Sequence, residues 1–398
     1  MFESFPIRLP SGSRWCRLLL LAVSLSNCAL AQSAHADIPI DVETGFLQSQ
    51  GAQPRFESAS KIATEGSVTL HQQQIVSVPH FTGSFFSEGK VFPYTLVGTR
   101  PQAGGTTEIP TQVIPVSLFF EGFEDERGEP IVLTPGQVLP RVMGSPNFRS
   151  TPYTAVGNAQ FADAVQRAQF FRIMAEDWHT TLGEPQEMKP VVVDVPRGLA
   201  KVYRNRSGGG LYAVVDSAFF ISQLNTIVQL EELRPDALAL VLTANVFLSP
   251  GVDVKKCCVL GFHTAFERGR LTSLPQVQTL VWASWIDQGI LGTSVADVTP
   301  LSHEISEWMN NPFGNNVVPA WQPLAGMGAC QTTIETADPL AALPNAGYPV
   351  IIDGYVYHPQ SQVLLSWFTR DPSSSLDGAF SFPDQSLVTR PAQPCSQR

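Results

Sequence analysis

The chain has 398 residues, of which 43% are hydrophobic and 15% are charged, and its formal net charge is −10. This length is ample for a large hydrophobic core and predicts two domains or one elaborated domain. Because the chain is acidic and has no basic cluster, nucleic acid and anionic membranes are poor candidates for partners.

The first 36 residues have the pattern of a secretory signal peptide. Arg14 and Arg17 precede an apolar run over 18–25, and Ala-x-Ala sites end at Ala31 and Ala36. Cleavage after Ala36 removes three of the 25 Lys and Arg and one of the 35 Asp and Glu, which leaves a net charge of −12. A lipoprotein anchored at Cys28 is the weaker alternative. We therefore expect a secreted or periplasmic protein.

The rest of the chain reads as strands and a few helices, with no apolar stretch of the roughly 18 residues that a membrane span needs. Residues 37–108 are expected to form a β-rich N-terminal segment, with strands at 68–70, 75–78, 81–86 and 91–97. The next part, 109–311, is expected to contain helices at 158–176 and 217–233 and strands at 112–120, 191–195, 237–248, 258–266 and 277–286. Pro115 predicts an edge or a bulge in the first of these strands. Residues 312–398 read as an irregular subdomain with a hairpin at 351–357.

One short helix, 299–310, carries the most informative motif. Thr299 is the expected N-cap, Pro300 suits the first helical position, and Pro312 cannot continue the helix. The side chains of one face are apolar (Leu301, Ile305, Trp308, Met309), whereas the other face holds His303, Glu304, Ser306 and Glu307. A solvated polar face is the ordinary interpretation of such a pattern.

The polar face also has the geometry of a metal site. His303 and Glu307 are four residues apart, so their side chains lie one turn apart on the same face and can grip one ion. The motif resembles the zinc-peptidase helix His-Glu-x-x-His, in which two histidines bind zinc and the glutamate is the general base. Here Glu307 replaces the second histidine, and a carboxylate oxygen is an accepted zinc ligand.

This resemblance implies an α+β fold of the zincin type, a mixed sheet with a backing helix and the active-site helix. It implies Zn²⁺, peptide or protein substrates and Glu304 as the general base. A third ligand should follow the helix, with Glu335 the first choice and Asp338 the second. His358 and His263 are further alternatives, although a structural role is the more ordinary one for His263. Two carboxylate ligands also leave room for a harder ion such as manganese or calcium.

A second resemblance concerns His303 to Glu307 and the sequence at 261–263, which are similar to plant exordium-like extracellular proteins. That family implies no established activity. The alternative function is therefore a non-catalytic extracellular binding or surface protein with a degenerate or structural metal site. Other chemistries are disfavoured, because no Gly-x-Ser-x-Gly elbow is present and Glu304 and Glu307 cannot flank a sugar from two faces.

Four cysteines remain after signal cleavage: Cys257, Cys258, Cys330 and Cys395. An even number in an exported chain predicts disulfides. Because a bond between neighbours is strained, we expect Cys257 and Cys258 each to pair with Cys330 or Cys395. A cysteine zinc site is the alternative, but Cys-x-x-Cys spacing is missing.

Overall fold

The computed structural model describes residues 75–398, apart from 206–209, 269–273, 293–294, 325–328, 342 and 396–398. It also gives the backbone of strands β1 (Asp41–Val42) and β2 (Arg55–Glu57). The expected signal peptide and the expected strand at 68–70 lie outside the described residues. Within these limits no helix has the length and apolar character needed to cross a bilayer.

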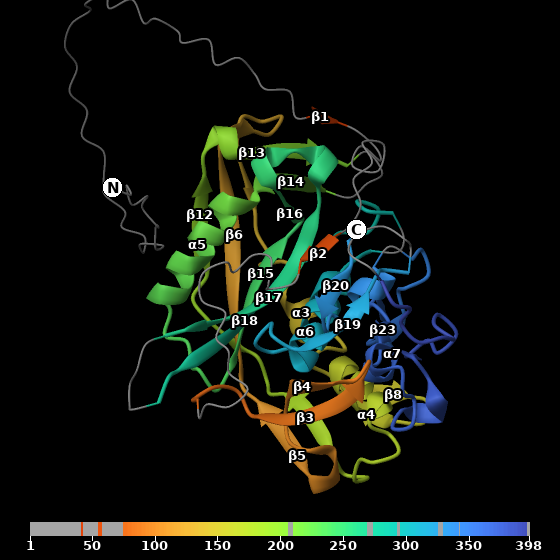
Figure 1. Ribbon diagram of the computed structural model, residues 1–398. Coiled ribbons are helices and arrows are strands. Elements are labelled where there is room, and N and C mark those ends of the chain that lie inside the picture. Colours follow the sequence, from red (N-terminus) through yellow and green to blue (C-terminus); the bar gives the residue numbers. More distant parts are fainter. Residues whose placement is uncertain are drawn as a thin grey trace, which may run out of the picture.

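A large mixed sheet forms the centre of the molecule (Figure 1). Its strand order is β1-β13-β14-β16-β17-β18-β15-β6-β11, with β12 and β7 also on β6 and β2 on β17. The strands are β6 (Thr111–Glu124), β7 (Pro130–Leu133), β11 (Gln186–Glu187), β12 (Val191–Val195), β13 (Ala200–Arg204), β14 (Leu211–Asp216), β15 (Leu238–Ala244), β16 (Val246–Ser249), β17 (Val259–Glu267) and β18 (Val277–Trp285). Strand β15 is parallel to both neighbours, whereas β17 is antiparallel to β16 and β18.

Helices cover both faces of this sheet. The helices are α3 (Leu139–Met143), α4 (Phe161–Gln169), α5 (Ser217–Leu230), α6 (Thr299–Asn310) and α7 (Leu365–Thr369). On β6 and β15, neighbouring residues belong to opposite cores: Val113 and Leu240 pack with α4 and α6, whereas Ile114 and Val241 pack with α5. Burial on both faces explains why the runs 113–116 of β6 and 238–242 of β15 are apolar without interruption. The protein is therefore α+β, as expected.

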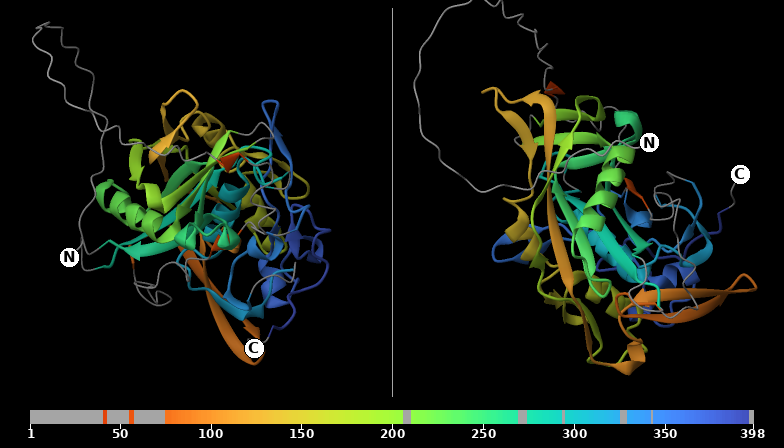
Figure 2. Two further views of the ribbon diagram at one scale, coloured as in Figure 1. Left: turned by 90° about the horizontal axis from the view of Figure 1, so that it is seen from above. Right: turned by 90° about the vertical axis from the view of Figure 1, so that its left-hand side faces the viewer.

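Six two-stranded sheets surround the centre. They pair β3 (His80–Ser87) with β4 (Lys90–Val97), β5 (Thr106–Ile109) with β10 (His179–Leu182), β8 (Thr151–Tyr153) with β9 (Gly157–Ala159), β19 (Val317–Trp321) with β20 (Gln331–Thr333), β21 (Val350–Ile352) with β22 (Tyr355–Tyr357), and β23 (Gln362–Val363) with β24 (Ser381–Phe382). The β3–β4 hairpin projects beyond the large sheet (Figure 2). The expected hairpin at 351–357 is confirmed, with Asp353 and Gly354 in left-handed conformations at its turn.

Three expectations about elements need correction. The helix expected at 158–176 is only α4, because its first residues pair as β9 and the chain turns after Phe170. The strand expected at 237–248 is two strands, separated at Asn245, whose left-handed backbone and side-chain bonds to Asp287 end the first. Pro115 is not at an edge; it is the last residue of β6 that pairs with β15.

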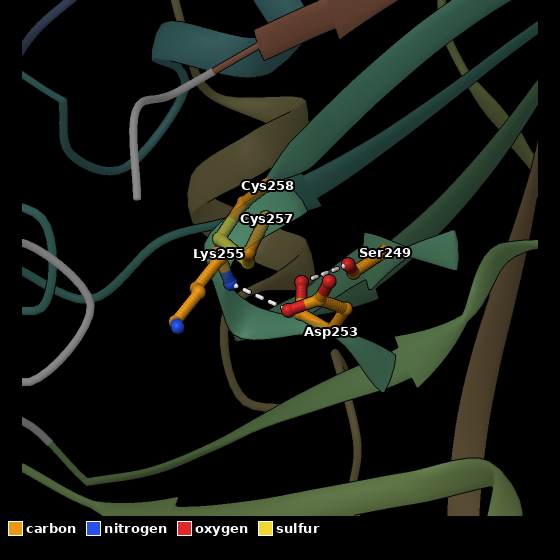
Figure 3. Close-up of a disulfide and its surroundings, with 5 residues drawn as sticks. All are labelled: Ser249, Asp253, Lys255, Cys257 and Cys258. Atoms are coloured by element: carbon orange, nitrogen blue, oxygen red, sulfur yellow. Dashed lines mark hydrogen bonds between the residues drawn. A yellow bond between two sulfur atoms is a disulfide. The ribbon is translucent and has the colours of Figure 1, made fainter. Parts of the chain in front are cut away.

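All four cysteines form disulfides, as expected, but the expected partners are wrong. Cys257 bonds to its neighbour Cys258, and Cys330 bonds to Cys395. A turn fixed by Asp253, whose carboxylate accepts from the Lys255 amide, precedes the cysteines (Figure 3). It places both in one apolar cluster that contains neither Cys330 nor Cys395, so only the neighbour is in reach.

This pairing gives a direct test. Trypsin cleaves after Lys256 and Arg268, so the two neighbouring cysteines fall in one peptide. Non-reducing mass spectrometry should find this peptide free of any cross-link to another peptide and lighter by two hydrogens than its reduced form.

The Cys330–Cys395 bond closes a loop with a sequence separation of 65. Replacing both cysteines by serine should therefore lower the free energy of unfolding by about 4 kcal/mol, the value that the chain-entropy model gives for a loop of this length. A disulfide-linked pair of peptides that joins 257–268 to the peptide of Cys330 or Cys395 would contradict the assigned pairing of the four cysteines.

Candidate metal centre

Helix α6 is buried on all sides, including the side that carries its charges. Leu301, Ile305 and Trp308 pack in the core between α6, α4 and the sheet. His303 and Glu304 are 0% exposed and Glu307 is 1% exposed. A solvated polar face is thus excluded for this helix.

The first turn of α6 is fixed by the segment after β22. The expected N-cap, Thr299, is instead the first residue of the helix, and its hydroxyl donates to the carbonyl of His358. The amide of Gln360 donates to the Ser302 hydroxyl. His358 itself pairs with Asp297, with 2.6 Å between Nδ1 and Oδ2. His358 therefore binds Asp297 at the start of the helix and is not in either group of converging ligand atoms.

His303, Glu307 and Asp338 form one group of converging ligand atoms. His303 Nε2 lies 3.2 Å from Glu307 Oε2 and 3.6 Å from Asp338 Oδ1. Bonds of about 2.0–2.2 Å at tetrahedral angles would place ligand atoms roughly 3.3–3.6 Å apart. The spacing of the group thus suits a small divalent ion.

Gln360 prepares His303 for this role. Its side-chain oxygen lies 3.1 Å from His303 Nδ1, and its amide nitrogen donates to the carbonyl of Ala337. Since that nitrogen is fixed as a donor, the Gln360 oxygen must accept, and His303 carries its proton on Nδ1. When a metal displaces the proton from Nε2, the Nε2 lone pair faces Glu307 and Asp338, the arrangement that outer partners of metal-binding histidines provide.

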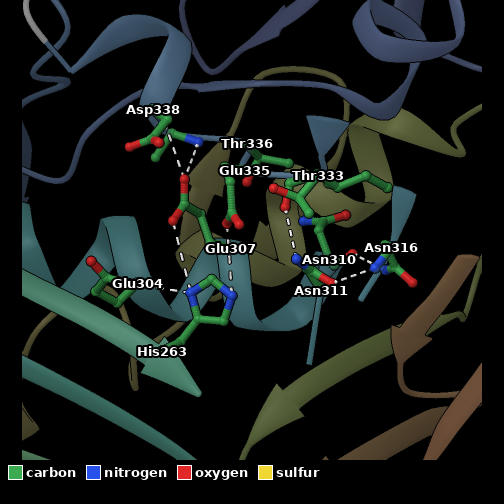
Figure 4. Close-up of polar contacts among 12 residues, drawn as sticks. His263, Glu304, Glu307, Asn310, Asn311, Asn316, Thr333, Glu335, Thr336 and Asp338 are labelled. Carbon is green, nitrogen blue, oxygen red and sulfur yellow. Dashed lines mark hydrogen bonds and ion pairs between the residues drawn. The ribbon is translucent and has the colours of Figure 1, made fainter. Parts of the chain in front are cut away.

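His263, Glu304 and Glu307 form a second group. His263 lies on β17, and its ring faces the carboxylates of α6 (Figure 4). Nδ1 is 3.3 Å from Glu304 Oε2 and 3.8 Å from Glu307 Oε2. The other ring nitrogen is 3.7 Å from Glu335 Oε2. Glu335, the first choice for the third ligand, thus lies against His263, whereas Asp338 lies against His303.

The two oxygens of Glu307 have different partners. Oε1 accepts hydrogen bonds from the backbone amides of Ala337 and Asp338 at 3.0 and 3.1 Å. Oε2 faces both histidines. Glu307 therefore holds the segment 335–338 against α6 with Oε1 and leaves Oε2 facing the position that a cation would take.

The centre concentrates negative charge away from solvent. Burial, the largest influence, raises the pKa of Glu304, of Glu307 and of Glu335. Burial would lower the pKa of His303, but Glu307 and Asp338 raise it well above its usual range. Burial lowers the pKa of His263 to about 3, so this ring is neutral at pH 7. In the absence of a cation the cluster therefore retains protons that a metal would displace.

Gly261 provides the space for Glu304. A Cβ atom at this position would lie 2.7 Å from Glu304 Cγ and 3.0 Å from the carbonyl oxygen of Trp282. Gly261 pairs with Ala283 in the β17–β18 ladder, so the backbone cannot easily retreat. The glycine thus allows β17 and α6 to approach closely beneath the charged cluster.

We expect Gly261→Ala to lower the free energy of unfolding by about 1–3 kcal/mol, the usual cost of overpacking. Gly198→Ala is a matched control, because a Cβ there would meet nothing within 4 Å. Denaturant titration of the two variants measures the difference. Equal stability of the two would show that Glu304 does not need this space.

The sequence predicted the helix and singled out the six ionisable residues of the centre, but it revealed neither Gln360 nor the space that Gly261 provides. The six are His263, His303, Glu304, Glu307, Glu335 and Asp338. No local pattern marks Gln360, because its role depends on a long-range contact.

Comparisons with family models, with curated proteins and with solved structures each found no match.

Proposed function

We propose that this chain is a secreted metal-dependent hydrolase of peptides, whose ion is held by His303, Glu307 and Asp338. The observation that carries the proposal is the convergence of these three ligand atoms, with Gln360 fixing the tautomer of the histidine. Secretion is supported by the two disulfides, which are typical of exported proteins.

Three protein ligands leave a fourth position for water, as catalytic zinc sites do. A divalent ion held there would acidify that water and polarise a substrate carbonyl. Glu304 would act as the proton acceptor. One of its oxygens faces His263 and the other, Oε1, has no hydrogen-bond partner in the described structure.

The relation to zinc peptidases rests on the variant His-Glu-x-x-Glu helix. Two carboxylate ligands and one histidine surround the ion with more negative charge than two histidines do, which weakens its Lewis acidity. The same ligand set accepts Mn²⁺ or Ca²⁺ as well as Zn²⁺.

One observation favours a second function, a non-catalytic extracellular protein with a structural ion. Asp338 is the most exposed of the three ligands at 8%, and the other two are at most 1% exposed. Closed surroundings are typical of structural metal sites. The two functions differ in whether water and small ligands reach the ion.

Metal content tests the proposal first. The purified mature protein should bind at least one equivalent of Zn²⁺ after chelation and reconstitution, with His303, Glu307 and Asp338 as the ligands of the first ion. Asp338→Asn should lose this ion, and Glu335→Gln, the matched control, should keep it. No ion under any of these conditions would refute both functions.

Access to the ion then separates the two functions. The Co²⁺-substituted protein should change its visible spectrum when a hydroxamate is added, and the protein loaded with one equivalent of Zn²⁺ should cleave members of a mixed peptide library. A tightly bound ion with no spectral change and no cleavage would assign the structural role.

A further inference from the structure

We propose that the centre has a second cation site, formed by His263, Glu304 and Glu307, and that Glu307 is shared by the two ions. The site would take a small divalent ion that prefers nitrogen and oxygen ligands, such as Zn²⁺ or Mn²⁺. Only its effect on catalysis rests on the proposed function.

The spacing of the second group supports this site. The 3.3 Å between His263 Nδ1 and Glu304 Oε2 lies within the roughly 3.3–3.6 Å expected of tetrahedral zinc ligands, and the 3.8 Å to Glu307 Oε2 is slightly longer. The ligands come from β17 and α6, two elements that Gly261 brings into close contact. The histidine is therefore rigidly placed above the helix.

Glu307 is suited to sharing. Its Oε2 atom faces His303 and His263, whereas Oε1 is held by two backbone amides. Ions that share a carboxylate in two-metal sites are about 3.5–4 Å apart. Because the two amides fix Oε1, the carboxylate cannot rotate, and Oε2 stays between the two histidines, where it can bind an ion beside each of them.

Buried polar atoms without partners lie on residues that form or flank the second site. Glu304 Oε1, His263 Nε2 and both oxygens of Glu335 make no hydrogen bond within the described residues. All three residues are at most 1% exposed. Buried polar atoms without partners are costly, and native proteins normally satisfy them with water or an ion.

Glu335 gains a role in this arrangement. Its Oε2 atom faces His263 Nε2 at 3.7 Å. A proton on Nε2 directed at this carboxylate leaves Nδ1 free for the ion, as in carboxylate–histidine–metal arrangements. Gln360 is already hydrogen-bonded to His303, whereas Glu335 would orient His263 in the same way once its Oε2 atom moved from 3.7 Å to hydrogen-bond distance of Nε2.

Charge balance favours two ions. The centre holds four carboxylates, and the ion pairs that they make within the described structure are all with histidines. With neutral imidazoles, one divalent ion balances two of the four carboxylates, and a second ion balances the other two without the protons that they would otherwise retain. Unpaired buried charge is strongly unfavourable.

The second ion would regulate the activity. A carboxylate that binds a cation is a poor proton acceptor, so an ion on Glu304 removes the proposed general base. The form with one ion would be active, and the form with two ions would be inhibited.

Metal stoichiometry tests the second site without relying on activity. Equilibrium dialysis of the metal-free protein against Zn²⁺, followed by elemental analysis, should give two equivalents for the wild type. Glu304→Gln and His263→Ala should each give one. Ser306→Ala, a buried change on the same helix outside both groups, should still give two. Circular dichroism identifies any variant that fails to fold, and Glu304→Gln preserves the shape of the side chain.

Mn²⁺ loading provides an independent measurement. The wild type should show the electron paramagnetic resonance signal of two coupled ions, and Glu304→Gln should show that of one isolated ion. A wild type that binds only one equivalent would overturn the second site and leave the proposed function intact. Two equivalents that both persist in Glu304→Gln and in folded His263→Ala would also overturn it, whereas no bound ion would overturn both proposals.

Discussion

Replacing Glu307 by alanine should abolish metal binding at the centre. The change removes the ligand common to both groups of converging atoms. Changing only an outer partner of a metal ligand weakens ion binding about 10–100-fold, so removal of a ligand should cost more than about 100-fold. Competition with a chromophoric chelator measures the affinity.

A second variant separates the two roles of this side chain. Alanine also removes Oε1, which accepts the amides of Ala337 and Asp338. Glu307→Gln can keep these two hydrogen bonds while placing an amide nitrogen where Oε2 stood. We expect Glu307→Gln to fold like the wild type and still to lose the ion.

Ser306→Ala is the control on the same helix, and it should bind metal as the wild type does. Retention of full affinity in Glu307→Gln would show that the helix does not supply this ligand. Loss of affinity only in the alanine variant would show that Glu307 acts by anchoring the 335–338 segment.

Local chemistry made helix α6 predictable. Pro300 and Pro312 bound the helix, and its expected range of 299–310 is the observed one. The apolar face was equally clear, since Leu301, Ile305 and Trp308 follow the helical period. What the pattern could not reveal is that the polar face is buried too, because the burial comes from β17 and from the segment around Glu335.

The choice between the downstream acids depended on contacts that spacing does not encode. Glu335 and Asp338 are three residues apart, and two amides bonded to Glu307 fix how the segment meets α6. Asp338 thereby reaches His303, and Glu335 reaches His263. His263 seemed an ordinary strand histidine because only the register of β17 places it over the helix.

The cysteine error has a similar origin. Strain made a bond between neighbouring residues look unfavourable, so distant partners seemed preferable. Where the chain enters β17, however, both sulfur atoms are enclosed in an apolar cluster. The sequence alone does not show which cysteine sulfur atoms the fold brings close enough to bond.

Replacing Glu304 by glutamine should reduce peptide hydrolysis by roughly 10²–10⁴-fold, the usual contribution of general acid–base catalysis. The amide has almost the same shape but cannot accept a proton. Glu304 is outside the group formed by His303, Glu307 and Asp338, so the variant should retain the first equivalent of metal. Turnover of the best-cleaved library peptide, measured with one equivalent of Zn²⁺, gives the comparison.

The paired measurement of metal and turnover assigns the role of Glu304. Normal turnover with the first ion bound would exclude Glu304 as the base. Loss of that first ion would make Glu304 a ligand of the catalytic site instead. A large fall in turnover with the first ion retained is the result expected of a proton acceptor, because His303, Glu307 and Asp338 still hold the ion while the transfer of its water's proton is blocked.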